Sequence, residues 1–450
     1  MTAHYTARRL PVLQGGAAWN AILPERFEAP PLAGTETCDV AIIGAGFAGL
    51  AAARRLRQGD PGLKISILDA LPVGEGGIGR NTGFMIDLPH NLTSDNYAGH
   101  GEREDRILTR LNRQAIEFVG KAVDEFGIDP AFFRRSGKIN GAVSPKGDAA
   151  NRSYARHLRE LGEPYELIEA EEMRRITGSP LYCCGLHTPG TVLLQPAGYG
   201  VGMARGLTRQ NAVRIHPSSA VTGFAKRRGG WTVTTAGGRI ETGRIILATN
   251  GHLESFGFER GRLLHLFLSA MMTAPLDAEA EARLGGEPFW GITPADPTGT
   301  TMRRIVDGAG RTRIVTRAGI SFHQNMSISP GEFRRAERLM RRKFAVRFPQ
   351  LADYPVDRSW AGHLCLSRND ASVVRELDDG VVAACVQNGL GTTRGTLTGI
   401  AAAERVLGVT SDISGYFSKG RRPSRLFPEP VTTIGARSLI RYKEWQSGLE

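Results

Sequence analysis

The chain of 450 residues is longer than one hydrophobic core usually supports, so its length predicts two domains. Its 41% of hydrophobic and 23% of charged residues are typical of a soluble globular protein. The net charge of +12 comes mainly from arginine, which supplies 49 of the 57 basic residues. The arginines are spread along the chain rather than clustered with aromatic residues, so we expect no nucleic-acid partner.

No stretch is typical of a membrane span or a secretion signal. The apolar runs are all shorter than the ~18 residues of a spanning helix, and the N-terminal stretch MTAHYTARRLPVLQGG has no apolar core. The five cysteines form no CxxC pair. We therefore expect a cytoplasmic protein with no disulfide, no metal site and no membrane span.

The first clear element is the stretch CDVAIIGAGFAGLAAARRLRQG. Residues 39–43 are short, apolar and β-branched, which predicts a buried strand, and residues 47–58 predict a helix. Between them, Gly44 permits a tight turn, Gly46 lets the backbone approach a pyrophosphate, and Gly49 lets the helix pack on the strand. The stretch predicts a dinucleotide site with the phosphates at the N-terminus of the helix.

A second predicted strand, KISILDA at residues 64–70, follows this helix and ends near Asp69. An acidic residue at the tip of this strand fits the acceptor of a ribose hydroxyl. The order of strand, glycine motif, helix, strand and acid is a far more specific indication of a nucleotide site than the glycine motif alone.

Three later stretches favour FAD over NAD. Residues 74–87 are rich in glycine where a plain NAD fold would continue into a helix, and their Arg80 and Asn81 can run back along a long cofactor. Residues 220–252 predict a β-meander that returns to a parallel strand. Residues 381–407 predict a buried strand, a glycine-rich turn and a helix whose N-terminus can hold an anion.

Other segments predict a second domain. Residues 102–126 carry an apolar stripe at helical spacing. Residues 263–276 and 301–319 predict long strands, the second of them a hairpin that turns at Asp307 and Gly308. We expect these strands to form a mixed sheet over the cofactor.

Six stretches in order carry a resemblance to a known family: DVAIIGAGFAGLAAARRL, GRNTG, LQPAGYGVGMARGL, IILATNGH, WAGHLCLSRND and NGLGTTRGTLTG. Together they resemble the D-amino acid oxidase and glycine oxidase superfamily of FAD-dependent flavoproteins. The lead-in to the first strand and the GRNTG stretch are most similar to the gamma-glutamylputrescine oxidase branch. The resemblance spans nearly the whole chain, from about residue 19 to about residue 408.

The resemblance implies an α/β fold with non-covalently bound FAD, in which a Rossmann-type FAD-binding domain joins a mixed-sheet α+β substrate domain, as in glycine oxidase. The implied FAD-binding domain is discontinuous and takes residues 30–95, 150–260 and 355–415. The implied substrate domain takes residues 96–149 and 261–354. Residues 1–29 form an N-terminal extension, and residues 416–450 form a C-terminal arm that we expect to wrap the body or a partner subunit.

The predicted FAD-binding residues come from four parts of the chain. The first turn and the second strand contribute Gly44, Gly46, Phe47, Ala48, Gly49, Asp69 and Ala70. The glycine-rich arm contributes Arg80, Asn81, Thr82 and Gly83. The meander contributes Val221, Ala248, Thr249, Asn250 and Gly251. The C-terminal turn contributes Gly389, Leu390, Gly391, Thr392 and Thr393.

The sequence departs from glycine oxidases where they bind the substrate carboxylate. Their block reads WAGLRP and its arginine holds the carboxylate, whereas this chain reads WAGHLC with Leu364 at that place. Strand alternation points one of Arg303 and Arg304 inward, and Arg317 lies on the same hairpin. These arginines are either surface charges or a bidentate carboxylate clamp. With His363, which the WAGHLC block places near the flavin, they are the predicted catalytic residues.

Several other residues allow both a structural and a functional interpretation. His90, His265, His323 and Trp290 either line the pocket or simply pack. Cys365 lies near the place where sarcosine oxidases attach their flavin, but its local spacing differs, so we expect no covalent bond. Sarcosine oxidases also use a lysine to activate oxygen, and the chain has no lysine between Lys226 and Lys343.

The residues and the resemblance together predict an FAD-dependent oxidase or dehydrogenase. It would oxidise the C–N bond of a small amino acid or secondary amine, such as an N-substituted glycine, by hydride transfer to the flavin N5, giving an imine that hydrolyses. The chain has no second dinucleotide motif, so we expect reoxidation by O2 or an electron carrier. Two alternatives remain open: an oxidase of a polyamine derivative, and a non-catalytic basic binding protein.

Overall fold

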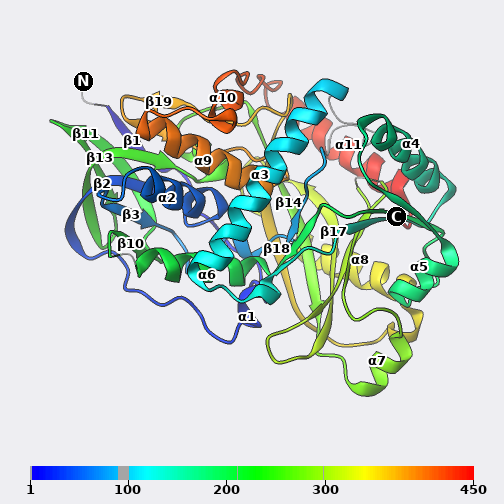
Figure 1. The fold of residues 1–450 in the computed structure, drawn as a ribbon. Helices are drawn as coiled ribbons and strands as arrows, with labels where there is room; N and C mark the ends of the chain where they lie inside the picture. Colours follow the sequence, from blue (N-terminus) through cyan, green and yellow to red (C-terminus); the bar gives the residue numbers. More distant parts are fainter. Residues whose placement is uncertain (1–2, 90–100, 210, 297) are drawn as a thin grey trace.

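The computed structural model describes residues 3–89, 101–209, 211–296 and 298–450, which form two large β-sheets with helices packed around them. Figure 1 shows the first sheet at the end of the molecule that carries the N-terminus and the second sheet toward the end that carries the C-terminus. The molecule therefore has the two-part α/β architecture that the sequence predicts.

The first sheet has nine strands, and its centre is parallel. In chain order they are β1 (His4–Thr6), β2 (Gly34–Ile43), β3 (Ile65–Leu68), β10 (Val213–His216), β11 (Val221–Arg227), β12 (Gly230–Thr235), β13 (Gly238–Leu247), β19 (Glu376–Asp378) and β20 (Val381–Ala383). The parallel strands lie in the order β20, β13, β2, β3, β10. Along β2, Val40 and Ile42 pack against helices while Ala41 and Ile43 pack against the meander, so both faces are buried.

Helices α2 (Phe47–Gly59), α6 (Pro196–Thr208) and α9 (Thr393–Leu407) pack on one face of this sheet. Small side chains let α2 and α9 approach each other closely, because a Cβ atom at Gly399 of α9 would lie 2.1 Å from the carbonyl oxygen of Ala48. The predicted meander and the predicted strand, turn and helix at the C-terminal end are both confirmed.

The second sheet has eight strands in the order β18, β14, β17, β16, β15, β6, β8, β7. Their bounds are β6 (Lys138–Ala142), β7 (Glu166–Glu169), β8 (Cys184–Thr188), β14 (Leu263–Thr273), β15 (Trp290–Pro294), β16 (Thr301–Val306), β17 (Thr312–Phe322) and β18 (Val356–Ser367). The pairing of β15 with β6 is parallel and the other pairings are antiparallel, so the predicted mixed sheet and its β16–β17 hairpin are confirmed.

The strand pairing departs from the expected domain division. Strands β7, β8 and β18 were expected in the FAD-binding domain, but they hydrogen-bond into the second sheet. The helix expected in the substrate domain, α3 (Glu102–Phe126), forms where predicted, but its buried face packs in the core of α2, α6 and α9. The expected boundary between residues 95 and 96 lies outside the described residues.

The remaining elements lie outside the two large sheets. A three-stranded sheet contains β4 (Phe84–Met85), β9 (Val192–Leu194) and β5 (Phe133–Arg134). The remaining α-helices before the C-terminal arm are α1 (Ala18–Ala21), α4 (Pro145–Leu161), α5 (Ala170–Thr177), α7 (Ala278–Leu284) and α8 (Pro330–Arg347). The 3-10 turns are η1 (Gly77–Gly79), η2 (Pro130–Phe132), η3 (Asn250–Phe256) and η4 (Pro349–Leu351). Among the described residues, no helix has both the length and the apolar character that crossing a membrane requires.

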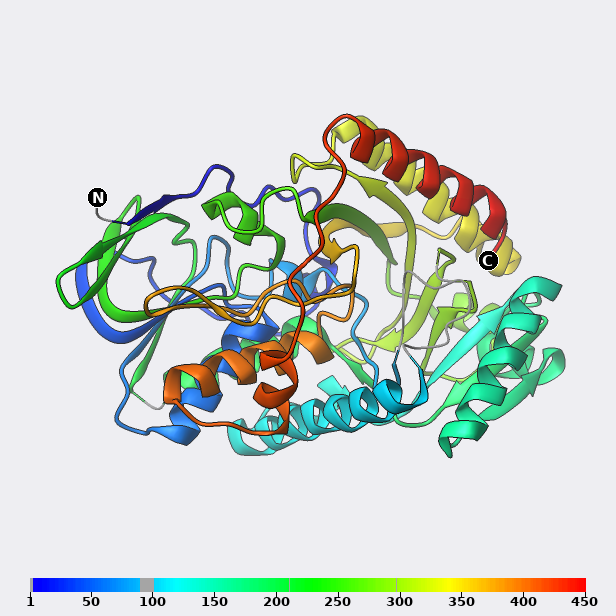
Figure 2. The same ribbon diagram turned by 90° about the horizontal axis from the view of Figure 1, so that it is seen from above.

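The C-terminal arm contains α10 (Asp412–Ser418) and α11 (Val431–Ser447), and it passes from the first sheet to the second. Figure 2 shows α11 (red) lying along α8 (yellow) on the outside of the second sheet. The arm ends in a buried position, where the Glu450 side chain accepts hydrogen bonds from Ser144 Oγ (2.5 Å) and the backbone N–H of Val143 (3.1 Å). Within this chain the arm wraps the body, as one of the two sequence-based alternatives states.

Candidate active site

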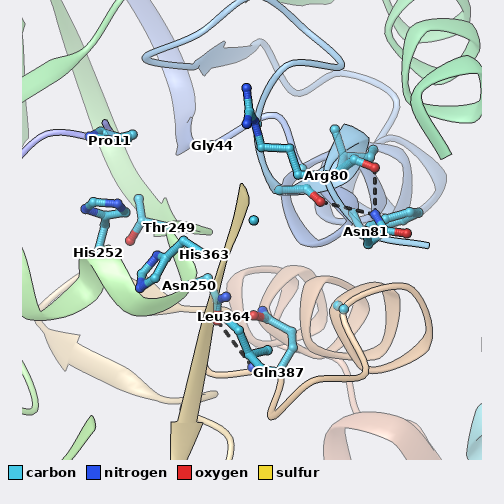
Figure 3. A pocket seen from close by; sticks show the side chains of 18 of the residues that line it. Pro11, Gly44, Arg80, Asn81, Thr249, Asn250, His252, His363, Leu364 and Gln387 are labelled. Carbon is cyan, nitrogen blue, oxygen red and sulfur yellow. Dashed lines mark hydrogen bonds between the residues drawn. The ribbon is translucent and has the colours of Figure 1, made fainter. Parts of the chain in front are cut away.

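One large pocket lies between the two sheets, and most of the predicted site residues line it. The first sheet contributes the β2–α2 turn and the residues after β3 and β13, and the second sheet contributes residues of β14–β18. Figure 3 shows side chains from these distant segments, among them Arg80, His252, His363 and Gln387, around one space.

The glycine turn uses its three glycines for three different purposes. Gly44 has a φ of +111°, which favours glycine, and Gly49 lies so close to it that a Cβ atom would be 1.8 Å from the Gly44 oxygen. Gly46, by contrast, has no protein atom within 4 Å of a Cβ position, although it lines the pocket. The open space at Gly46, in front of the N-terminus of α2, fits the pyrophosphate of FAD.

Asp69 follows β3 directly and faces the same turn. Its carboxylate accepts hydrogen bonds from the backbone N–H groups of Ala45 (2.7 Å) and Leu71 (2.9 Å), while burial raises its pKa. These two bonds fix the carboxylate at the tip of the strand. Its remaining lone pairs are available to a ribose hydroxyl, as the sequence predicts.

The GRNTG arm lines the pocket mainly with its backbone. The Arg80 guanidinium donates to the backbone oxygens of Glu75, Gln14, Gly15 and Ala361, and burial lowers its pKa to about 10. In the same arm, the Asn81 side chain closes the turn on Gly77, Ile78 and Gly83. Both side chains therefore hold the arm in place against other parts of the protein.

The turn before α9 completes the cofactor side of the pocket. The residues 389–392 line it, and Thr392 Oγ1 donates to the backbone oxygen of Phe84 (2.6 Å). Just before this turn, Val386 and Asn388 have φ values of +62° and +49°. A β-branched residue is rare in this conformation, so the surrounding structure must hold the turn.

Eighteen of the twenty-one predicted FAD-binding residues line the pocket, and Gly49, Gly251 and Thr393 do not. Gly49 packs the helix on the strand, as described above. Gly251 is needed because a Cβ atom there would lie 2.8 Å from the His363 ring. Thr393 is fully buried and donates to the backbone oxygen of Ile86 (3.1 Å). These three shape the pocket from behind.

Two of the predicted catalytic arginines, Arg303 and Arg304, lie outside the pocket. Strand β16 is covered on both faces, so both side chains are buried. Arg303 donates to the backbone oxygens of Thr82 (2.8 Å) and Leu194 (2.6 Å), and Arg304 donates to that of Gly285.

The surroundings of Arg303 explain how a guanidinium can be buried there without a substrate anion. The rings of Trp19, Phe84 and Phe289 lie 5.0–5.8 Å from its centre, and burial lowers its pKa to about 9. Arg303 is therefore neither a surface charge nor part of the pocket, because carbonyl oxygens and aromatic faces surround its guanidinium.

Arg317 is the predicted arginine that lines the pocket. It is paired in register with Ala270 and Thr301, and its Nη1 donates to the backbone oxygen of Gly299 (3.3 Å). Arg313, on the same face of β17, is instead paired with Asp307 (3.0 Å) and Asp357 (2.9 Å).

A buried lysine on β6 stands behind Thr293, three strands along the sheet from Arg317. The Lys138 Nζ contacts Thr293 Oγ1 (3.3 Å) and also Asn140 Oδ1, and burial lowers its pKa to about 8. Thr293 and Thr301 line the pocket on the same face of the sheet. Sequence analysis did not find Lys138, because β6 joins this sheet through a pairing with β15, which is 155 residues away at this contact.

His363 lines the pocket at one end of a hydrogen-bonded chain. Its Nε2 lies 3.0 Å from His265 Nδ1, and His265 Nε2 lies 2.7 Å from Glu254 Oε2. If Glu254 accepts from His265, then His265 accepts from His363, and His363 Nδ1 keeps a lone pair. His363 lies on the opposite face of β18 from Leu364, so it does not share a wall with Arg317.

Burial keeps the histidines at this end of the pocket neutral. Desolvation, and then the nearby His252 and His265, lower the pKa of His363 well below its usual value. Desolvation, followed by His265, lowers the pKa of His252 to about 4. His252 lines the pocket beside His363, with the ring centres 5.2 Å apart. Among the described residues, no group of three or more His, Cys, Asp or Glu side chains is arranged to hold a metal ion.

The remaining candidates from the sequence have structural positions. His323 is buried near Glu332, Trp290 stacks on Phe348, and Cys365 is fully buried; none of the three lines the pocket. His265 is fully buried in the hydrogen-bonded chain, and His90 lies outside the described residues.

No feature of the sequence indicates the contribution of the N-terminal segment. Residues 9–13 line the pocket, β1 pairs with β11, and Ala361 donates its backbone N–H to the Gln14 oxygen (2.9 Å). The segment was expected to be an extension, because it has no apolar periodicity or glycine motif. Some of its contacts, such as the β1–β11 pairing and the Gln14 carbonyl, are made by backbone groups, which the side-chain pattern does not encode.

Comparison with known proteins agrees with this geometry. The family described as FAD dependent oxidoreductase matches residues 39–405. A probable oxidoreductase OrdL of Rhizobium meliloti is 25% identical over 404 residues, covering 90% of this chain and 91% of that protein. The gamma-glutamylputrescine oxidoreductase of Escherichia coli is 24% identical over 409 residues, covering 89% of this chain and 91% of that protein.

Solved structures show the same fold. Glycine oxidase from Geobacillus kaustophilus superposes with a TM-score of 0.67 at 16% identity, covering 84% of this chain and 96% of that one. Iminodiacetate oxidase from Chelativorans sp. BNC1 superposes with a TM-score of 0.61 at 16% identity, covering 83% and 96%. The expected glycine oxidase-like fold and the FAD cofactor are confirmed.

Proposed function

Because the chain belongs to the family of FAD dependent oxidoreductases, we propose that it oxidises the C–N bond of a small amino acid or secondary amine, such as an N-substituted glycine. The product is an imine that hydrolyses, and O2 reoxidises the cofactor. The observation that carries the proposal is one pocket that reaches from the cofactor turn at Gly46 to Arg317 on the second sheet.

The relatives support an amine or amino-acid donor. By its name, the E. coli relative acts on gamma-glutamylputrescine, and the two solved oxidases act on glycine and iminodiacetate. All three compounds carry a C–H bond next to an amine nitrogen. When bound, FAD accepts the hydride of such a bond.

Arg317 is the residue that we assign to the substrate carboxylate. It stands on the pocket face of the second sheet with Thr301 and Thr293, and the buried Lys138 adds a second positive charge behind Thr293. Two cations near the site attract a carboxylate and lower the pKa of a bound ammonium. The amine must be neutral before its C–H bond is oxidised, so the same charges that orient the substrate also favour its reactive form.

The His363–His265–Glu254 chain is the proton path that we assign to this site. A proton taken up at His363 Nδ1 lets His363 Nε2–H pass to His265 and His265 Nε2–H pass to Glu254, whose side chain is 16% exposed. Oxidation of an ammonium substrate releases protons, and reduction of O2 consumes them. These three hydrogen-bonded side chains connect the pocket with the surface without opening the pocket to bulk water.

Glu254→Gln tests this path, because an amide cannot take up the proton. We expect FAD content to be unchanged and flavin turnover to fall roughly tenfold to 100-fold, with an altered pH profile. Glu332→Gln is the matched control, because Glu332 also faces a buried histidine, His323 (3.6 Å), outside the pocket. Equal behaviour of the two variants would remove the proton path from the proposal.

A polyamine derivative is the second candidate substrate. Leu364 occupies the place of the carboxylate-binding arginine, and the name of the E. coli relative points to such a compound. Apolar pocket residues such as Leu268 and Leu390 can pack against a methylene chain.

Flavin bleaching without oxygen separates the two candidates. The holoenzyme is mixed with N-methylglycine, glycine, iminodiacetate, gamma-glutamylputrescine and putrescine, and each acid is compared with its decarboxylated amine. We expect an N-substituted glycine to bleach the flavin faster than its amine analogue. Faster bleaching by the amines supports the polyamine alternative, and no bleaching by any of them contradicts both.

A further inference from the structure

Helix α11 turns its apolar side away from the protein. Five of its six large apolar residues recur at spacings of 3, 5, 3 and 3 residues, which places them on one side of a helix with 3.6 residues per turn, while Ile440 lies on the other side. The five are highly exposed: Val431 (56%), Ile434 (62%), Leu439 (54%), Tyr442 (55%) and Trp445 (79%).

The side of α11 that faces the protein is largely polar, with Ala436 and Ile440 half-buried on it. Thr432 and Ser447 are the buried residues of the helix, and Glu444 accepts a hydrogen bond from the backbone N–H of Ile320 on β17 (3.2 Å). A surface helix normally does the reverse and buries its apolar stripe. The protein's own core therefore gives no reason for the apolar side of α11.

The neighbouring helix α8 presents arginines to solvent. Five exposed arginines lie on one side of it: Arg334, Arg335, Arg338, Arg341 and Arg342. The opposite side is buried and packs through Phe333, Met340 and Phe344. Within the part of the chain that the structure describes, none of the five arginines forms an ion pair with a carboxylate.

Helix α11 runs along α8 in the view of Figure 2, and side-chain contacts between the two helices lie at their ends. At their C-terminal ends, Lys343 donates to the oxygens of Gly448 and Glu450, and Arg347 donates to that of Leu449 (2.9 Å). At their N-terminal ends, Arg437 lies near enough to Glu332 to contribute to lowering the pKa of that carboxyl. Apolar residues of α11 and arginines of α8 are thus both exposed to solvent in this part of the molecule.

We propose that this α8–α11 face docks on an anionic lipid surface. An apolar side with aromatic residues next to a row of arginines is the pattern of a helix that lies in the membrane interface. Tyr442 and Trp445 suit the headgroup region, and Arg441 flanks the apolar side on α11 itself. A second copy of the chain fits this face less well, because a two-fold contact would bring the two rows of arginines together.

Tryptophan fluorescence gives a direct test with the holoenzyme. Trp445 is 79% exposed, while the other four tryptophans are at most 4% exposed. A change in the emission wavelength on binding therefore reports on the surroundings of Trp445. We expect vesicles of phosphatidylglycerol and phosphatidylcholine to shift the emission to the blue and to co-sediment with the protein. Vesicles of phosphatidylcholine alone should bind at least tenfold more weakly.

Substitutions separate the contributions of the two helices. The triple change Arg334→Glu, Arg338→Glu and Arg341→Glu should weaken binding to anionic vesicles by roughly 100-fold or more. Its matched control reverses three other exposed arginines with the same change in net charge: Arg103, Arg156 and Arg239. Ile434→Gln should also weaken binding, while Val409→Gln, at an exposed residue away from this face, should not.

Three outcomes would overturn the proposal. The first is no binding to anionic vesicles, which leaves an acidic protein as the partner of this face. The second is equal loss of binding in the two triple variants, which reduces the effect to net charge. The third is a concentration-dependent dimer whose formation alone shifts the Trp445 emission, which assigns the face to a second copy of the chain.

Discussion

The two sides of the pocket are built by different means. The side from the first sheet includes three glycine-rich or helix-end segments, where backbone groups can face the pocket: the turn at Gly44 and Gly46, the N-terminus of α2 and the turn before α9. The side from the second sheet is made of side chains that include Arg317, Thr293 and Leu268. The shape of a backbone surface depends on the positions where a Cβ atom would collide with its neighbours. The chemistry of a side-chain surface depends on which residue occupies each position.

This difference separates a side of the pocket that depends on the path of the backbone from a side that depends on the identity of each side chain. A cofactor held by backbone N–H groups needs a fixed path of the chain, and the residues that secure it, such as Asp69 and Arg80, contact other backbone groups. The substrate side can exchange one side chain for another without changing the path of its strands. Leu364 in a block where glycine oxidases carry arginine is such an exchange.

The largest expected effect is on the backbone side. Gly46→Val should abolish FAD binding, because the branched side chain would occupy the open space in front of α2. The flavin absorbance of the purified protein measures this. Gly415→Val is the control, since a Cβ atom at Gly415 also meets no protein atom within 4 Å and lies away from the pocket. A fully yellow Gly46→Val protein would contradict the cofactor assignment.

A smaller effect is expected on the side-chain side. Arg317→Met should lower kcat/KM for the best amino-acid substrate by about 2–4 kcal/mol, while FAD content and activity on the decarboxylated amine change little. Arg304→Met, the neighbouring arginine outside the pocket, should leave the preference for the acid intact. If both variants keep that preference, Arg317 is not the carboxylate ligand.

The pH dependence of stability tests the histidine end of the pocket. His252 has a folded-state pKa of about 4 against an unfolded value near 6.5, so the unfolded chain binds the proton more tightly. Stability from this group is present above pH 6.5 and is lost as the pH falls, by about 2 kcal/mol between pH 7 and pH 5.

Urea unfolding at the two pH values measures this loss. His252→Asn should flatten the pH dependence by that amount, and replacing the exposed His4 by asparagine should not change it. An unchanged slope in His252→Asn would mean that His252 does not stay neutral in the folded protein.

The smallest expected effect concerns Cys365. Its side chain is fully buried, it does not line the pocket, and burial raises its pKa well above the usual value, so the thiolate that would attack a flavin is disfavoured. Acid-denatured protein should release all its flavin into the supernatant, and Cys365→Ala should release the same amount. Colour that stays in the wild-type pellet and disappears in the variant would show a covalent bond.

The residues on the cofactor side of the pocket could be predicted from the sequence, because their contacts are local. Gly44, Gly46 and Asp69 lie within one strand–turn–helix–strand unit, and each residue type has one geometric reason to be there. The strands of the second sheet were also readable, since alternation and turn residues are properties of short segments.

The sequence could not predict which single residues line the substrate side of the pocket. Alternation on β16 predicts that Arg303 and Arg304 point in opposite directions, but it does not show that both directions lead into protein. The partners of His363 are equally hidden, because His265 is 98 residues away and meets it only through the pairing of β14 with β18. Such contacts depend on which strands become neighbours.

The Arg80 guanidinium also determines when the pocket can form. It joins the N-terminal segment at Gln14 to Ala361 on β18, a residue 281 positions further along the chain than Arg80 itself. Contacts of such long range form late, because the loop between them must close first. During synthesis the nucleotide turn therefore leaves the ribosome before the residues of the opposite wall have been made.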